Sequence, residues 1–120
     1  MQHSRHLAFV FLKPPYGRSL AADGLDMLLA TAAFDQKITA IFLGSGLFNL
    51  LPGQSHDINM KNQTKAFASL PLFDVANVLV DEREIQRYGL NIEQFLLPVT
   101  AVSLASVREH LHAADHVHSF

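Results

Sequence analysis

The chain has 120 residues, of which 49% are hydrophobic and only 17% charged, and its formal net charge is −2. This length fits one domain with its own core, and the nine scattered Lys and Arg residues form no basic stripe for direct nucleic-acid binding. The chain has no cysteine, which excludes disulfides, thiolate metal ligands and a cysteine nucleophile or sulfur carrier within it.

The first half of the chain is predicted to alternate strand and helix. Leu7–Leu12 is an uninterrupted apolar run, which favours a strand buried on both faces. Ser19–Phe34 keeps its apolar residues at near-helical spacing and predicts a helix. Gly24 within it costs about 1 kcal/mol relative to alanine and would permit a close approach to a neighbouring element. Ile38–Leu43 predicts the second strand.

The second half begins with a polar segment, Gln54–Gln63, which we expect to be a surface loop. A short helix is predicted over Thr64–Leu70, a third strand over Ala76–Val80 and a charged helical turn over Asp81–Tyr88. The remaining segments are Asn91–Phe95, which is ambiguous, a strand at Val99–Val102, a helix at Ser103–Ala113 and a terminal strand at His116–Phe120.

This alternation predicts a single α/β domain over residues 1–120, built on a mainly parallel sheet. No apolar run approaches the roughly 20 residues that span a bilayer. The N-terminal apolar segment lacks a small-residue cleavage site and is interpreted as the first strand. A cytoplasmic protein is therefore expected.

The glycines at Gly44-Ser45-Gly46 follow a predicted strand, as phosphate-binding loops do. However, a dinucleotide fingerprint needs a third glycine where this chain has Asn49, and no Gly-Lys-Ser/Thr triplet of a P-loop is present. The glycines are better interpreted as a sharp backbone turn. Ser45 and Tyr16, in the glycine loops, show no catalytic-triad context.

Histidines gather near the C-terminus: His110, His112, His116 and His118. His116 and His118 would share one face of a strand, so both imidazoles could reach one metal ion. Few acidic residues stand nearby, and histidines at a helix C-terminus favour the helix dipole without any metal. No metal site is assigned.

Asp81 directly follows the third predicted strand, where open α/β sheets carry their sites. It could serve as a general base or a ligand group. The simpler interpretation is a helix-capping aspartate beside a Glu84–Arg87 helical pair, and the sequence favours it because no nucleophile or histidine stands nearby.

An apolar cluster follows the glycine turn and comprises Leu47, Phe48, Leu50, Leu51 and Pro52. A loop core could bury these side chains. A contiguous apolar loop on a small domain more often marks a surface that binds a partner protein. We therefore predict that this cluster is an interface.

Four stretches together resemble the DsrE/DsrF/DsrH-like sulfur-relay family, and they cover nearly the whole chain. They are AFVFLKPPYG (Ala8–Gly17), DGLDMLLATAAF (Asp23–Phe34), IFLGSGLFNLLPGQ (Ile41–Gln54) and DHVHSF (Asp115–Phe120). The resemblance implies a single layer of about five mainly parallel strands with helices on both faces.

The resemblance also implies assembly with TusB-like and TusD-like subunits into a dimer of heterotrimers. That complex relays sulfur through a TusE-like protein toward the 2-thiolation of wobble uridine in tRNA. In the family, the sulfur-carrying cysteine of the TusD-like subunit lies just after the third strand, at the position of Asp81. Because aspartate cannot form a persulfide, the resemblance implies a non-catalytic docking subunit without a cofactor, and not an enzyme.

One alternative of a different class remains. A small flavodoxin-like ligand-binding domain or enzyme would use the loops after the first three strands, at residues 13–18, 44–54 and 81–84. Such a domain should be a stable monomer whose melting temperature rises with nucleotide or flavin.

Overall fold

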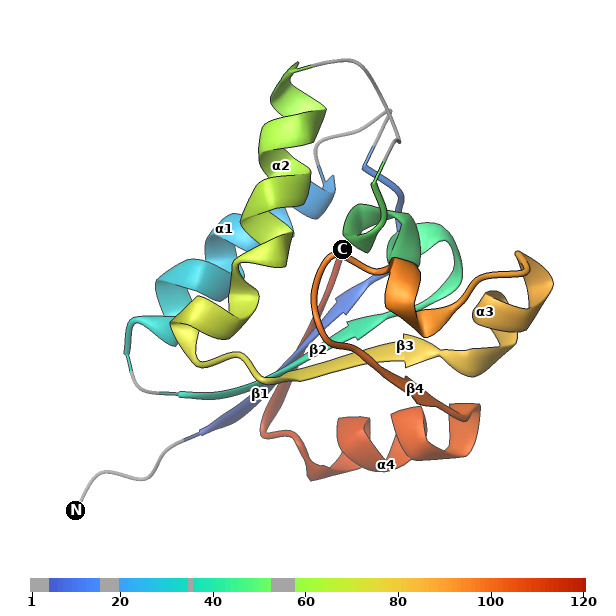
Figure 1. Cartoon of the computed structure of the whole chain (residues 1–120). Helices are drawn as coiled ribbons and strands as arrows, with labels where there is room; N and C mark the ends of the chain where they lie inside the picture. Colours follow the sequence, from blue (N-terminus) through green and yellow to red (C-terminus); the bar gives the residue numbers. More distant parts are fainter. Residues whose placement is uncertain (1–4, 16–19, 35, 53–57) are drawn as a thin grey trace.

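The computed structural model describes residues 5–15, 20–34, 36–52 and 58–120 of the chain. Five strands form one sheet in the order β4-β3-β2-β1-β5, and every neighbouring pair is parallel (Figure 1). The strands are β1 (His6–Phe11), β2 (Lys37–Phe42), β3 (Asn77–Asp81), β4 (Thr100–Val102) and β5 (His116–Ser119). The predicted α/β fold is confirmed, and the sheet is wholly parallel.

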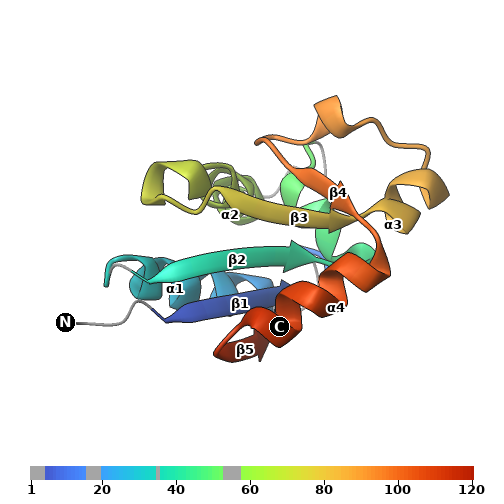
Figure 2. The same ribbon diagram turned by 90° about the horizontal axis from the view of Figure 1, so that it is seen from below.

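Helices cover both faces of this sheet (Figure 2). The α-helices are α1 (Leu20–Ala32), α2 (Ile58–Ala68), α3 (Glu82–Arg87) and α4 (Leu104–Ala113), and the 3₁₀ turns are η1 (Gly44–Leu50), η2 (Leu70–Phe73) and η3 (Ile92–Gln94). The connections from β1 to β4 step in one direction, so right-handed crossovers place α1 and α2 on the same face. The return from β4 to β5 reverses direction and places α4 on the opposite face.

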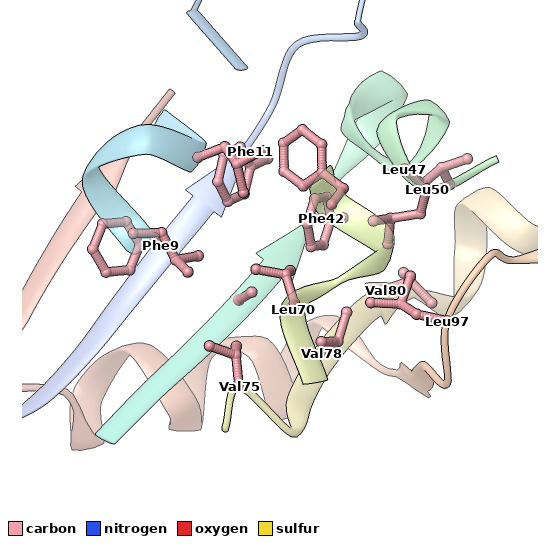
Figure 3. Packing of buried hydrophobic residues seen from close by; sticks show 14 of the residues in the cluster. Phe9, Phe11, Phe42, Leu47, Leu50, Leu70, Val75, Val78, Val80 and Leu97 are labelled. Atoms are coloured by element: carbon pink, nitrogen blue, oxygen red, sulfur yellow. The ribbon is translucent and has the colours of Figure 1, made fainter. Parts of the chain in front are cut away.

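The larger core lies between the sheet and the α1–α2 layer, and aromatic rings form its centre (Figure 3). Phe11 stacks on Phe42 with ring centroids 4.9 Å apart, and Phe67 of α2 meets both rings edge-on. All three side chains are fully buried. The uninterrupted apolar runs in the strands are explained by a second, smaller core under α4, formed by Val10, Ile41, Leu79 and Val107.

Gly24 allows the close approach that the sequence suggested. A Cβ atom at this position would lie 2.6 Å from Cγ of Phe120 and 2.8 Å from Cε1 of Phe11. The backbone of Phe120 is tied to β1, because its N–H donates to the Val10 carbonyl at 2.8 Å and its carbonyl accepts from the Leu12 N–H at 2.7 Å. The missing side chain of Gly24 therefore leaves room for the C-terminal phenylalanine against the core.

One boundary prediction was wrong. The polar segment Gln54–Gln63 was expected to be a loop, but α2 already begins at Ile58; residues 54–57 lie outside the described part of the chain. The amino-terminal half of α2 extends past the sheet (Figure 1), and its sequence is mostly polar, so its few apolar residues show no helical period. Among the described residues, no helix is long and apolar enough to cross a membrane.

Candidate functional site at the carboxyl ends of the strands

Asp81 is the last residue of β3 and caps α3. Its side chain is 1% exposed, and its Oδ1 accepts a 3.0 Å hydrogen bond from the backbone N–H of Arg83. The guanidinium of Arg83 also donates to both carboxylate oxygens, with Nη2 2.8 Å from Oδ2 and Nε 3.2 Å from Oδ1. This fork holds the carboxylate in one orientation.

The ion pair determines the charge state of Asp81. The side-chain hydrogen bonds from Arg83 lower the pKa of this carboxyl below its ordinary value, and they outweigh burial, which raises it. The same contact raises the pKa of Arg83. Asp81 is therefore ionised at neutral pH with both oxygens engaged, which makes it a poor general base. The capping interpretation of this residue is confirmed.

The rest of α3 carries further contacts between side chains, which begin at the mostly buried Glu84 and reach the exposed Arg87. Nη1 of Arg87 lies 3.8 Å from Oε2 of Glu84, which is the helical pair expected from the sequence. The guanidinium of Arg87 also lies 5.6 Å from the ring centroid of Tyr88. The Tyr88 ring in turn meets Phe48 edge-on, with centroids 4.9 Å apart. These contacts join α3 to η1.

The glycine turn after β2 lets the backbone turn sharply and pass close to the end of β1. Gly44 has φ +54°, which favours glycine, and a Cβ on Gly46 would collide with the Phe11 carbonyl oxygen at the end of β1. The side chain of Asn49 donates to the carbonyls of Lys13 and Gly46, both at 2.9 Å. Sequence analysis did not identify this fully buried amide, which ties η1 to the segment after β1. Tyr16, in that segment, lies outside the described residues.

Three residues of the predicted apolar interface belong to the core. Leu47 and Leu50 are fully buried and Leu51 is 5% exposed, because η1 folds back over the carboxyl end of the sheet (Figure 3). The expectation that these leucines face a partner protein was therefore wrong. Phe48 remains half-buried and Pro52 exposed.

A neighbouring segment carries exposed apolar side chains at this edge instead. Tyr88, Ile92 and Leu96 each expose between 41% and 45% of their surface. Leu96 adjoins η1, because its N–H donates to the carbonyl of Leu50 at 2.9 Å. Sequence reasoning missed this surface, because Phe95, Leu96 and Leu97 are three consecutive apolar residues. Only the structure shows that Leu96 is exposed while the residues on either side of it are buried.

The C-terminal histidines are held by separate contacts. His110 Nδ1 lies 2.8 Å from the Ser106 carbonyl, His118 lies against the Phe9 ring, and His116 Nε2 lies 3.4 Å from Arg5 Nη1. Among the described residues, no group of three or more potential metal ligands comes together. The preceding Asp115 fixes the start of β5, because its carboxylate accepts from the His6 N–H at 2.8 Å.

A parallel five-stranded sheet with helices on both faces, and with a helix-capping aspartate at the end of its third strand, defines a small α/β domain. The DsrE/DsrF-like family matches residues 5–120 of this chain, and the chain belongs to that family.

Relatives of the chain agree with this assignment along nearly their whole length. It is 35% identical to "Protein TusC" of Buchnera aphidicola subsp. Baizongia pistaciae (strain Bp) over 118 residues, which cover 97% of this chain and 99% of the relative. It is 32% identical to "Protein TusC homolog" of Vibrio vulnificus (strain CMCP6) over 115 residues, covering 95% and 98%. The crystal structure of the ychN protein from E. coli has the same fold, with a TM-score of 0.79 at 17% identity over 97% of this chain and 99% of that one.

Proposed function

We propose that this chain is a non-catalytic docking subunit of a TusBCD-type sulfur-relay complex, which supports the 2-thiolation of wobble uridine in tRNA. Its similarity to proteins named TusC over nearly the full length supports this assignment. The observation that carries the non-catalytic role is Asp81, which is fixed by Arg83 at the position where the resemblance expects the sulfur-carrying cysteine of a partner subunit.

Sulfur relay by a persulfide requires a thiolate, because only a thiolate attacks a sulfane sulfur and later releases it. This chain has no cysteine, and the carboxylate at position 81 is held in an ion pair. The chemistry therefore belongs to a neighbouring subunit. The role of this chain is to bind its partner subunits and complete the complex.

We further propose that the partner contact uses the carboxyl-edge surface, which comprises Phe48, Pro52, Tyr88, Ile92 and Leu96. Its members lie on η1 and on the segment from α3 to β4, and contacts between Phe48 and Tyr88 and between Leu50 and Leu96 join the two. Apolar side chains that expose two-fifths of their surface beside one another are typical of a protein-binding site. The partners are TusB-like and TusD-like subunits in a cytoplasmic dimer of heterotrimers, which relays sulfur to a TusE-like protein.

Co-expression with the two partner subunits tests this surface. Leu96→Asp should prevent co-purification while leaving the circular dichroism spectrum unchanged. Leu104→Asp is the matched control, because Leu104 is equally exposed, at 41%, but begins α4 on the other face of the sheet. If Leu96→Asp assembles as well as the unaltered chain, the carboxyl-edge surface is not the contact.

The role itself is tested separately. If the purified chain alone accepted labelled sulfur from a cysteine desulfurase, the docking role would be wrong. A melting temperature that rose with flavin or nucleotide would instead favour the ligand-binding alternative.

A further inference from the structure

A pocket of about 450 Å³ lies far from the carboxyl-edge surface, between the second half of α1 and the amino ends of β1 and β5. This volume is within the range of small-ligand sites. Its lining includes four apolar side chains and two nitrogen-bearing ones, namely Leu7, Met27, Ala30, Phe34, Arg5 and His116.

The apolar part of this pocket has a buried base and open walls. Leu7 of β1 is 7% exposed, whereas Met27 and Phe34 of α1 expose 40% and 75% of their side chains. An apolar group bound on Leu7 would cover both exposed side chains. The hydrophobic effect would therefore favour such a group over water.

Arg5 is the one Arg, Lys, Asp or Glu side chain among the described residues that line the pocket. Its guanidinium lies 3.4 Å from Nε2 of His116, measured from Nη1. The nearby carboxylate of Asp115 already accepts from the His6 N–H. Gln36 fixes the backbone of Arg5, because its Oε1 accepts from the Arg5 N–H at 2.9 Å. The backbone of the arginine is thus anchored at the edge of the pocket. Among the described residues, none accepts a hydrogen bond from its guanidinium through a carboxylate.

We propose that this pocket binds an apolar group that carries a carboxylate. The carboxylate accepts hydrogen bonds from the Arg5 guanidinium, whose geometry matches two carboxylate oxygens. The apolar body lies on Leu7 between Met27 and Phe34. Two sources share this chemistry: the C-terminal residue of a polypeptide, and a free arylalkanoate.

Isothermal titration of the full chain tests the site with matched pairs of probes. The first pair is 3-phenylpropanoate and its uncharged amide, and the second is the peptide acetyl-Ser-Val-Phe with a free or an amidated C-terminus. Each acid should bind, and each amide should bind about tenfold more weakly, because it cannot form the charge-assisted fork. Tighter binding of the peptide acid identifies a polypeptide terminus as the source, and tighter binding of 3-phenylpropanoate identifies a free carboxylate.

Variants locate the binding. Arg5→Gln should weaken both acids about tenfold and leave the amides unchanged. Ala30→Trp, which fills the pocket while keeping the charge, should abolish binding of all four probes. Arg108→Gln on α4 removes an exposed arginine on the opposite face and should have no effect. The proposal is overturned if neither acid binds, if acid and amide bind equally, or if Arg108→Gln weakens binding as much as Arg5→Gln does.

Discussion

Two apolar segments meet at the carboxyl edge of the sheet, and they differ in how much apolar side-chain surface they expose. In η1, Leu47 and Leu50 are fully buried. In the segment from α3 to β4, Tyr88 and Leu96 are two-fifths exposed. The two segments touch through the hydrogen bond from Leu96 to Leu50. A run of apolar residues in the sequence therefore does not show whether a segment belongs to the core or to a docking surface. Whether neighbouring elements leave room to bury its side chains decides this.

The largest expected effect separates these two leucines directly. Leu50→Asp places a carboxylate in the core and should lower the free energy of unfolding by more than about 4 kcal/mol, which is enough to unfold a small domain. Leu96→Asp should change stability by less than about 1 kcal/mol, because its side chain already meets solvent. Urea unfolding followed by circular dichroism measures both. Equal losses in the free energy of unfolding would contradict the assignment of Leu50 to the core and of Leu96 to the surface.

The glycine turn tests what holds η1 in its buried position. Gly46→Ala should cost about 3 kcal/mol, because the added methyl group collides with the Phe11 carbonyl oxygen. Gly44→Ala should cost about 1 kcal/mol, since its φ of +54° is unfavourable but nothing lies within 4 Å of the new atom. Thermal unfolding compares the two variants. A larger loss for Gly44→Ala would mean that backbone conformation, not the close approach, sets this turn.

Asp81 fixes the start of the segment from α3 to β4, and Asp81→Ala should cost about 1 kcal/mol at pH 7 through the lost cap. The pKa of Asp81 is lower in the folded protein than its ordinary value of 3.8. Its contribution is therefore fully present above pH 3.8 and is lost as the pH falls through the still lower folded pKa. The difference in the free energy of unfolding between Asp81→Ala and the unaltered chain should therefore become smaller in that acid range.

The smallest expected effect on stability concerns Tyr88. Tyr88→Ala removes the ring contact with Phe48 and should cost about 0.5–1 kcal/mol, while weakening assembly with the partner subunits. Phe73→Ala is a matched control, because Phe73 is similarly exposed in η2 at the amino end of β3 and makes no ring contact with any residue the structure describes. If both variants assembled equally well, the aromatic part of the carboxyl-edge surface would have no role in docking.

Much of the fold was predictable because three of its strands, β1, β2 and β3, are buried on both faces. The runs at Leu7–Leu12 and Ile38–Leu43 each differ from the observed strands by one residue at either end. The direction of η1 was not predictable, since it depends on how the turn at Gly46 meets the end of β1. The start of α2 was missed because the sequence of the amino-terminal half of that helix is mostly polar.

The cap at Asp81 and the pocket at Arg5 also differ in how far the sequence could predict them. Asp81 could be interpreted as a cap because it stands between a predicted strand and a predicted helical turn, and the N–H that it caps, that of Arg83, is only two residues away. The pocket was invisible because Arg5 and His116 are 111 residues apart and meet only when β5 pairs with β1. An interaction between residues close together in the sequence can be inferred from the sequence. A site whose residues come together only through strand pairing cannot.

The most direct test of the central claim is an intact-mass measurement on each subunit of the co-expressed complex, after incubation with a cysteine desulfurase and cysteine. We predict that this chain co-purifies with both TusB-like and TusD-like subunits and keeps its 13.3 kDa mass. The TusD-like subunit should gain the mass of sulfur. Sulfur on this chain, or its failure to co-purify with either partner, would contradict the docking role.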